Sequence, residues 1–171
     1  MIMKEIRLEK ITLNMGAGDN AQKLESSKKV LELLAGKKVA VTKTKKRTTF
    51  GTPKGKEIGV MVTLRRKEAD EMLKKLAKAI EFKIKPSQFD NSGNFSFGVK
   101  EYIHIQGAHY DPEIGILGLD VAVTLERPGF RVKRRKNPSK IGKGHRIKKE
   151  EAMEWAKNFG FRIIEKEEEQ Y

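Results

Sequence analysis

Two basic segments without an acidic residue are the clearest chemical feature of this sequence. Residues 37–56 contain eight Lys and Arg residues, and residues 127–149 contain eleven. The remaining chain holds 18 basic and 23 acidic residues, so the formal net charge of +14 comes entirely from the two segments. Because clustered cations without counter-charges attract phosphates, both segments are typical of a surface that binds a polyanion. The alternative is that they are ordinary solvated loops.

The composition of the two segments favours a folded RNA over a single strand. Their glycines and prolines disfavour long helices, so we expect extended loops that become ordered on a partner. Phe50 and Phe130 are their only aromatic residues, whereas proteins that bind single strands stack bases on several aromatic side chains. Structured RNA is recognised mainly through its phosphates and riboses, which suits this composition.

Two glycine-containing motifs could instead bind a nucleotide. Residues 16–21 match the G-x-G-x-x-A turn of dinucleotide-binding proteins, between a predicted strand and a predicted helix. Residues 39–46, however, contain no acidic residue that could bind a ribose. Residues 51–56 are one residue too short for a phosphate-binding loop, and Glu57 stands where a Ser or Thr would hold magnesium. We reject the second motif and keep the first as an alternative.

No set of side chains in the sequence indicates a catalytic or metal site. The chain has no Cys, and His104, His109 and His145 lack the spacing of metal ligands. Asp111 and Glu113 flank a proline in a predicted loop, where nothing indicates acid–base chemistry. We therefore predict that the chain is not an enzyme and needs no metal or cofactor.

Length and hydropathy favour a single domain. The chain has 171 residues, and no apolar run approaches the roughly 20 residues that a membrane span needs. The N-terminus lacks the pattern of a signal peptide. We expect a cytoplasmic protein without a membrane partner, in which residues 1–164 form one domain and residues 165–171 form a frayed acidic tail.

Hydrophobic periodicity predicts the elements that must position the basic segments. Strands are predicted over 9–14, 39–42, 58–64, 94–99, 102–105, 119–125 and 161–164. Helices are predicted from Asp19 or Asn20 to Gly36, over 67–81 and over 149–159. This order predicts an α+β fold, with helices packed on one face of a largely antiparallel sheet and the other face free. Basic loops are predicted at 43–57, as a projecting hairpin, and at 127–148.

Four motifs, in order along the chain, together resemble one protein family. They are Ile11–Gly18, Val41–Lys46 followed by Ile58–Arg65, Phe89–Glu101, and Gly118–Val121. The sequence resembles universal large-subunit ribosomal protein five, the 5S rRNA-binding protein of the central protuberance, over about residues 8–164. Three further segments resemble its archaeal and eukaryotic branch, and we expect the archaeal form: Arg127–Phe130, Gly144–Ile147 and Glu150–Ala152.

The resemblance implies three groups of RNA-binding residues. A polar sheet face and its edge are expected to bind 5S rRNA: Lys10, Thr12, Asn14, Met15, Gly16, Lys43, Thr63 and Arg65. The first basic loop is expected to contact peptidyl-site tRNA: Lys45, Lys46, Arg47, Thr48, Thr49, Phe50, Gly51, Lys54 and Lys56. The second basic loop is expected to contact other rRNA: Arg127, Arg131, Lys133, Arg134, Arg135, Lys136, Lys140, Lys143, His145 and Arg146.

The resemblance also implies a set of partners in the ribosome. These are 5S rRNA, 23S rRNA, peptidyl-site tRNA, a neighbouring 5S-binding ribosomal protein, and a small-subunit head protein across an intersubunit bridge. The leading hypothesis is therefore a structural component of the large ribosomal subunit. The alternatives are a free-standing module that binds structured RNA and a dinucleotide-dependent enzyme.

Overall fold

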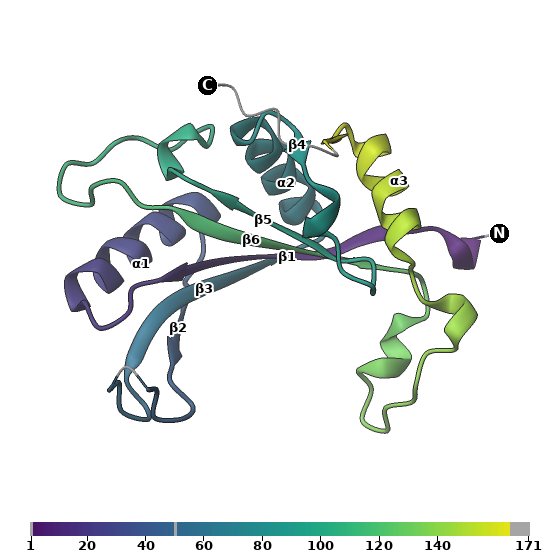
Figure 1. Cartoon of the computed structure of the whole chain (residues 1–171), viewed down its shortest axis with the longest axis horizontal. Coiled ribbons are helices and arrows are strands. Elements are labelled where there is room, and N and C mark those ends of the chain that lie inside the picture. Colours follow the sequence, from purple (N-terminus) through teal and green to yellow (C-terminus); the bar gives the residue numbers. More distant parts are fainter. Residues whose placement is uncertain (1, 50, 165–171) are drawn as a thin grey trace.

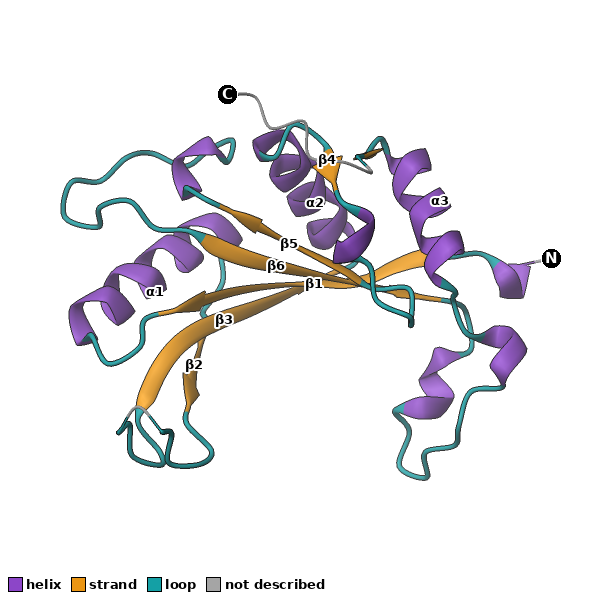
Figure 2. Ribbon diagram, in the orientation of Figure 1, coloured by secondary structure: helices purple, strands orange, loops and turns teal. Residues whose placement is uncertain are grey.

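A five-stranded sheet forms the centre of the molecule, with the strand order β2-β3-β1-β6-β5 (Figures 1 and 2). The computed structural model describes residues 2–49 and 51–164. The strands of this sheet are β1 (Arg7–Gly16), β2 (Ala40–Lys43), β3 (Glu57–Arg65), β5 (Phe95–Val99) and β6 (Leu119–Glu126). Every neighbouring pair is antiparallel, which confirms the predicted α+β class with a largely antiparallel sheet.

Hydrophobic residues alternate with polar ones along β1, the central strand of the sheet. Ile11 and Leu13 are fully buried and Met15 is nearly so, while Thr12 is half-buried and Asn14 is exposed. Side chains in a strand point alternately to opposite faces, so one face of β1 enters the core and the other stays polar.

The helices α1 (Ala21–Ala35) and α2 (Lys67–Ala79) pack on the core side of the sheet, against β1 and β3 (Figure 1). Leu31 of α1 and Leu73 of α2 are fully buried there. The helix α3 (Lys149–Phe159) packs through Ala152 and Ala156, which are also fully buried. The prediction that helices cover one face of the sheet is confirmed.

Helix α1 begins and ends where its sequence signals predict. The Asn20 side-chain oxygen accepts a hydrogen bond from the Lys23 backbone N–H at 3.1 Å, which satisfies one of the free amides at the helix start. Gly36 ends the helix in the left-handed conformation, with φ at 62°, where a side chain would be strained. The connection from β1 into α1 is therefore set by local chemistry.

The predicted strand at residues 102–105 is wrong. Tyr102–His104 forms a 3₁₀ turn, η3, and its backbone does not pair with a strand. Tyr102 and Ile105 are both buried and lie three residues apart, which is the period of a 3₁₀ turn. The Tyr102 hydroxyl accepts a hydrogen bond from the Asp111 backbone N–H at 3.3 Å and so holds the following loop.

A small second sheet was not predicted. Strands β4 (Lys83–Ile84) and β7 (Arg162–Ile163) pair in parallel, so the last predicted strand exists but lies outside the main sheet. Two-residue strands carry too little pattern to be recognised in a sequence. The predicted tail at residues 165–171 lies outside the described residues. Within the described ranges, no helix is long and apolar enough to cross a membrane.

Candidate nucleic-acid interface

The face of the sheet opposite α1 and α2, which we call the open face, brings together five of the predicted RNA-binding residues. Lys10, Thr12 and Asn14 lie on the polar side of β1. On the adjacent β3, Arg65 pairs with Lys10 in the strand register and Thr63 pairs with Thr12. The hydroxyls of Thr12 and Thr63 are 3.5 Å apart. The alternation in two neighbouring strands therefore produces one continuous polar surface.

The other three residues predicted to bind 5S rRNA differ in their placement. Met15 is only 2% exposed and packs in the core, so only its backbone is available to a ligand. The strand period explains this, because Met15 has the same parity as the buried Leu13. Gly16 is exposed at the end of β1, and Lys43 is exposed at the end of β2, where it pairs with Glu57 at 3.1 Å.

The β5–β6 half of the open face carries short side chains. Ser96, Gly98 and Ala122 are exposed there, and none of them has a long side chain. Asp120, opposite Asn14 in the strand register, adds a negative charge to this half. The cations of the open face lie instead on the β1–β3 half. A phosphate backbone is therefore favoured along β1 and β3.

A network of arginines and glutamates lies where the open face meets the second basic loop (residues 127–148). Glu9 occupies a register shift in β1, and its carboxylate pairs with Arg65 at 3.3 Å and with Arg134. Glu126 pairs with Arg134 at 2.7 Å and with Arg7 at 3.1 Å. A bulge re-aims side chains, which explains how Glu9 reaches two arginines. The network joins the loop to the sheet.

The first basic loop (residues 43–57) is held at its base by backbone and threonine hydrogen bonds. Thr44 is only 8% exposed, and its hydroxyl donates to the Pro53 carbonyl at 2.6 Å. Its backbone N–H donates to the Lys56 carbonyl at 2.9 Å, and Thr48 and Thr52 bond to each other farther along. Lys56 pairs with Asp19 at 3.1 Å. The flanking strands β2 and β3 pair in antiparallel fashion.

Four cations of this loop remain exposed and form no ion pair with any described residue. They are Lys45, Lys46, Arg47 and Lys54. Thr49 and Gly51 are also exposed, while Phe50 lies outside the described residues. The loop therefore offers a cluster of available positive charges, and Lys43 and Lys56 at its base are already paired.

Arg127 is an interior residue, so its predicted contact with rRNA is not supported by an exposed side chain. It is only 6% exposed, and its guanidinium pairs with Glu151 of α3 at 2.8 Å and donates to the Arg146 carbonyl at 3.3 Å. The Lys148 backbone N–H, and then the Arg127 guanidinium, hold the pKa of Glu151 below its usual range. Arg127 thus fastens the second basic loop to α3.

The second basic loop forms several contacts within itself, and the expectation that it becomes ordered on a partner stays a prediction. It contains two 3₁₀ turns, Phe130–Lys133 and Lys143–His145. The His145 Nε2–H donates to the Pro128 carbonyl at 2.9 Å, and its ring lies edge-on to Phe130 at 5.7 Å between centroids. His145 therefore has a packing role that the sequence prediction missed.

The remaining predicted cations of this loop are exposed, and of these only Arg134 and Arg135 have side-chain partners among the described residues. Arg135 bonds to the Asn137 carbonyl and the Ser139 hydroxyl, and Arg134 belongs to the network described above. The others are Arg131, Lys133, Lys136, Lys140, Lys143 and Arg146.

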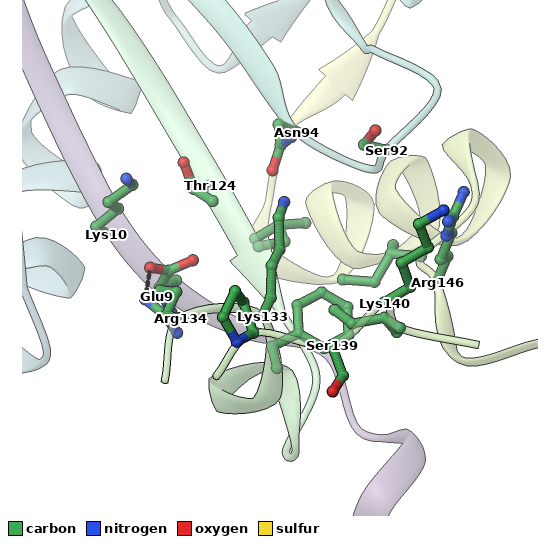
Figure 3. A pocket seen from close by; sticks show the side chains of 15 residues that line it. Glu9, Lys10, Ser92, Asn94, Thr124, Lys133, Arg134, Ser139, Lys140 and Arg146 are labelled. Carbon is green, nitrogen blue, oxygen red and sulfur yellow. Dashed lines mark hydrogen bonds and ion pairs between the residues drawn. The ribbon is translucent and has the colours of Figure 1, made fainter. Parts of the chain in front are cut away.

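A cleft of about 700 Å³ opens between the second basic loop and the end of the open face (Figure 3). Lys10 and Thr124 approach it from the sheet, and Asn94 approaches it from the start of β5. Lys133 and Lys140 approach it from the loop. Its size lies in the usual range of ligand sites, about 300–1,000 Å³.

The G-x-G-x-x-A turn does not belong to a dinucleotide-binding unit. Such a unit needs parallel strands on either side of its helix, but β1 pairs only with β3 and β6, and both pairs are antiparallel. The Asn20 side chain occupies an amide at the start of α1 where the pyrophosphate would bind. Within the described ranges, no cluster of three or more acidic or histidine side chains could hold a metal ion.

Comparison with known proteins decides the family. A model for ribosomal protein L5 matches residues 2–49, and a model for the C-terminus of the same ribosomal family matches residues 57–155. The chain belongs to the ribosomal protein L5 family. It is 46% identical over 167 residues to large ribosomal subunit protein uL5 of Sulfolobus acidocaldarius, covering 96% of this chain and 94% of that protein.

Two further relatives carry the same name. The protein of Sulfurisphaera tokodaii is 49% identical, covering 95% of this chain and 94% of its own, and that of Nanoarchaeum equitans is 48% identical, covering 95% and 98%. All three organisms are archaea, which confirms the predicted branch. Membership of a family of ribosomal proteins also confirms that the chain is not an enzyme.

Sequence reasoning missed the acidic and neutral members of the interface. Clusters of cations do not reveal Glu9 and Glu126, and the bulge that re-aims Glu9 has no sequence signal. Thr124 lies in the strand predicted over 119–125 but was not assigned to a site, although the register places it opposite Lys10. Asn94 becomes part of the interface only because the loop before β5 packs beside the second basic loop.

Proposed function

We propose that this protein is a structural component of the large ribosomal subunit that binds 5S rRNA through its open face. The family membership and the names of the relatives support the subunit assignment. The open face, with Lys10, Asn14 and Arg65 exposed or half-exposed and none of the described helices over it (Figure 1), supports the RNA-binding assignment. This uncovered polar sheet face is the observation on which the proposal rests most.

Hydrogen bonds from the open face suit the minor groove and loops of structured RNA. The Thr12 and Thr63 hydroxyls and the Asn14 amide can each donate and accept, which matches ribose 2′-hydroxyls. Lys10 and Arg65 supply charge for the phosphates. Arg65 must share its guanidinium between Glu9 and a phosphate, so Lys10 carries the more available charge.

The first basic loop is proposed to contact peptidyl-site tRNA. Four unpaired cations on a loop that is closed by its own hydrogen bonds can meet a second RNA without disturbing the sheet. The exposed cations of the second basic loop are proposed to contact 5S or 23S rRNA. In the assembled ribosome we further propose a neighbouring 5S-binding ribosomal protein and a small-subunit head protein, across an intersubunit bridge, as protein partners.

Footprinting on isolated 5S rRNA tests the central proposal. We expect the purified protein to protect a continuous set of riboses, and the variant Lys10→Ala/Arg65→Ala to lose that protection while its circular dichroism is unchanged. Lys28→Ala/Lys29→Ala, which removes two exposed cations from α1, is the matched control. Sedimentation with large subunits after a moderate salt wash tests incorporation. RNA binding without such sedimentation would indicate a free-standing RNA-binding module instead.

A further inference from the structure

The cleft between the second basic loop and the open face has two chemically different parts. Four apolar residues line the cleft, and we call them its floor: Leu125 and Ile147, which are buried, and Phe130 and Ile141, which are half-buried. Cations surround this apolar floor, and Glu9 is the one acidic residue among those that line the cleft. An apolar floor with a cationic rim matches a nucleotide, which has a flat apolar base and a charged phosphate.

The rim cations are available for a ligand. Lys10, Lys133, Lys140 and Arg146 form no side-chain ion pair or hydrogen bond with any residue in the described ranges. Figure 3 shows the long side chain of Lys133 reaching from the loop toward Asn94 and Thr124. Arg134, in contrast, is held by Glu9 and Glu126. The network therefore gives Arg134 a structural role, while the other four rim cations have no partner among the described residues.

Asn94 presents a fixed polar group to the cleft. Its side-chain N–H donates to the Asp90 carboxylate at 2.9 Å, and Asp90 also accepts from the backbone N–H groups of Ser92 and Asn94. This turn leaves the Asn94 side-chain oxygen free among the described residues to accept a further hydrogen bond. An exocyclic amino group on a base edge is a suitable donor.

We propose that the cleft takes one unpaired nucleotide of the bound RNA, with its base against the half-buried apolar side chains of Phe130 and Ile141. This inference rests on the proposed RNA-binding function and adds to it a specific recognition site. A base in a helix is stacked and cannot enter such a cleft, so only a bulged or loop nucleotide fits. The phosphates on either side of that nucleotide contact Lys133 and Lys140.

Three RNA hairpins that share one stem test the site without altering the protein. One is fully paired, one carries a single unpaired adenosine, and one carries an abasic residue in place of that adenosine. Because a stacked base contributes about fivefold or more to affinity, we expect at least that preference for the unpaired adenosine over both other hairpins. Fluorescence anisotropy at one fixed salt concentration gives the three dissociation constants.

Two lysines of the same loop give a matched pair of variants. Lys133 lines the cleft, whereas Lys136 is equally exposed but lies outside it. We expect Ile141→Ala to abolish the preference for the unpaired adenosine. Lys133→Ala is expected to reduce it, because the Lys133 phosphate contact forms only when the nucleotide enters the cleft. Lys136→Ala loses the same charge, so it lowers affinity for all three hairpins alike and keeps the preference.

Intact 5S rRNA, titrated in parallel, separates the inference from the proposed function. Equal binding of all three hairpins by the wild-type protein, together with normal binding of 5S rRNA, overturns the nucleotide site and leaves the proposed function standing. A reduced preference in Lys136→Ala as well as Lys133→Ala also overturns it, because the effect would then follow net charge. Failure to bind 5S rRNA overturns the proposed function itself.

Discussion

Arg127 is a buried cation whose partners come from a loop and a helix. Its guanidinium contacts Glu151 at 2.8 Å and the Arg146 carbonyl at 3.3 Å. Replacement by Met keeps the volume but leaves both acceptors without their donor, which costs about 2 kcal/mol of unfolding free energy. Urea unfolding measures this loss. Arg131→Met, at an exposed position of the same loop, is the control and is expected to change stability by less than about 0.5 kcal/mol.

Glu151 makes the attachment of α3 sensitive to acid. The Lys148 backbone N–H and the Arg127 guanidinium lower the pKa of this carboxyl in the folded state. A lowered pKa stabilises the fold above the pKa of the unfolded state, and the contribution is lost as pH falls through the folded value. We therefore expect the stability difference between wild type and Glu151→Gln to be largest near pH 7 and to shrink in acid. Thermal unfolding at several pH values checks this, and a difference that grows in acid would contradict it.

Asn14 is the most exposed of the hydrogen-bonding residues in the centre of β1. It forms no hydrogen bond with any described side chain, so Asn14→Ala leaves the core intact. We expect its loss to weaken 5S rRNA binding by about 1 kcal/mol, the usual value of one hydrogen bond. Filter binding measures the affinity, and Asn158→Ala, an exposed position of α3, is the control. Unchanged binding by the folded Asn14→Ala variant would assign the RNA to another surface.

At the scale of elements, the predictable parts are those with many residues in one pattern. Strand β1, helix α2 and helix α3 follow from periodicity over six or more residues, and the shared face of β1 and β3 follows from their alternation. The strand prediction for residues 102–105 was wrong because the pattern of four residues cannot distinguish a strand from a 3₁₀ turn. The pairing of β4 with β7 depends on how distant segments pack, which no local pattern contains.

The same limit applies to the candidate site. Polar residues on strands could be assigned to the open face because their direction follows from their parity. Cations in the second basic loop could not be divided into buried and exposed, because loop geometry comes from long-range partners such as Arg127 with Glu151. The cleft likewise depends on the loop before β5 lying next to the second basic loop. Charge alone therefore located the interface without resolving its members.

The first basic loop is expected to act separately from the sheet. Arg47 and Lys54 are exposed and form no ion pair with described residues, so Arg47→Ala/Lys54→Ala removes no folded-state contact that the structure describes. We expect stability within about 0.5 kcal/mol of wild type and full 5S rRNA occupancy. Each lost charge contact is expected to weaken tRNA engagement by about 1 kcal/mol or less.

Reconstituted large subunits carrying the double variant provide the measurement. Occupancy of 5S rRNA and the dissociation rate of peptidyl-site tRNA are determined in the same preparation. Faster tRNA dissociation at normal occupancy is the expected result. If 5S rRNA occupancy is lost while tRNA dissociation is unchanged, the 5S rRNA-binding site must be assigned to the loop and not to the sheet.

For the whole molecule, the formal net charge of +14 predicts a strong but limited dependence of 5S rRNA binding on salt. Several cations near the open face are already neutralised by Glu9 and Glu126, so the effective number of phosphate contacts is well below the number of basic residues. With about six phosphates neutralised, the logarithm of affinity should fall against the logarithm of salt concentration with a slope of about −4 to −5. Titrations at several salt concentrations give the slope, and a value near zero would rule out recognition of a polyanion.

Both basic loops extend from the same side of the sheet, at its two ends, away from α2 and α3 (Figure 1). The molecule is therefore arched, with one of the two positively charged loops at each end. With both loops binding RNA as proposed, attachment of one loop holds the other close to its own target, so its rebinding becomes an intramolecular event. Release of the protein then requires both loops to detach within the same brief interval. Such an arrangement gives long residence even when each individual contact is weak and exchanges rapidly.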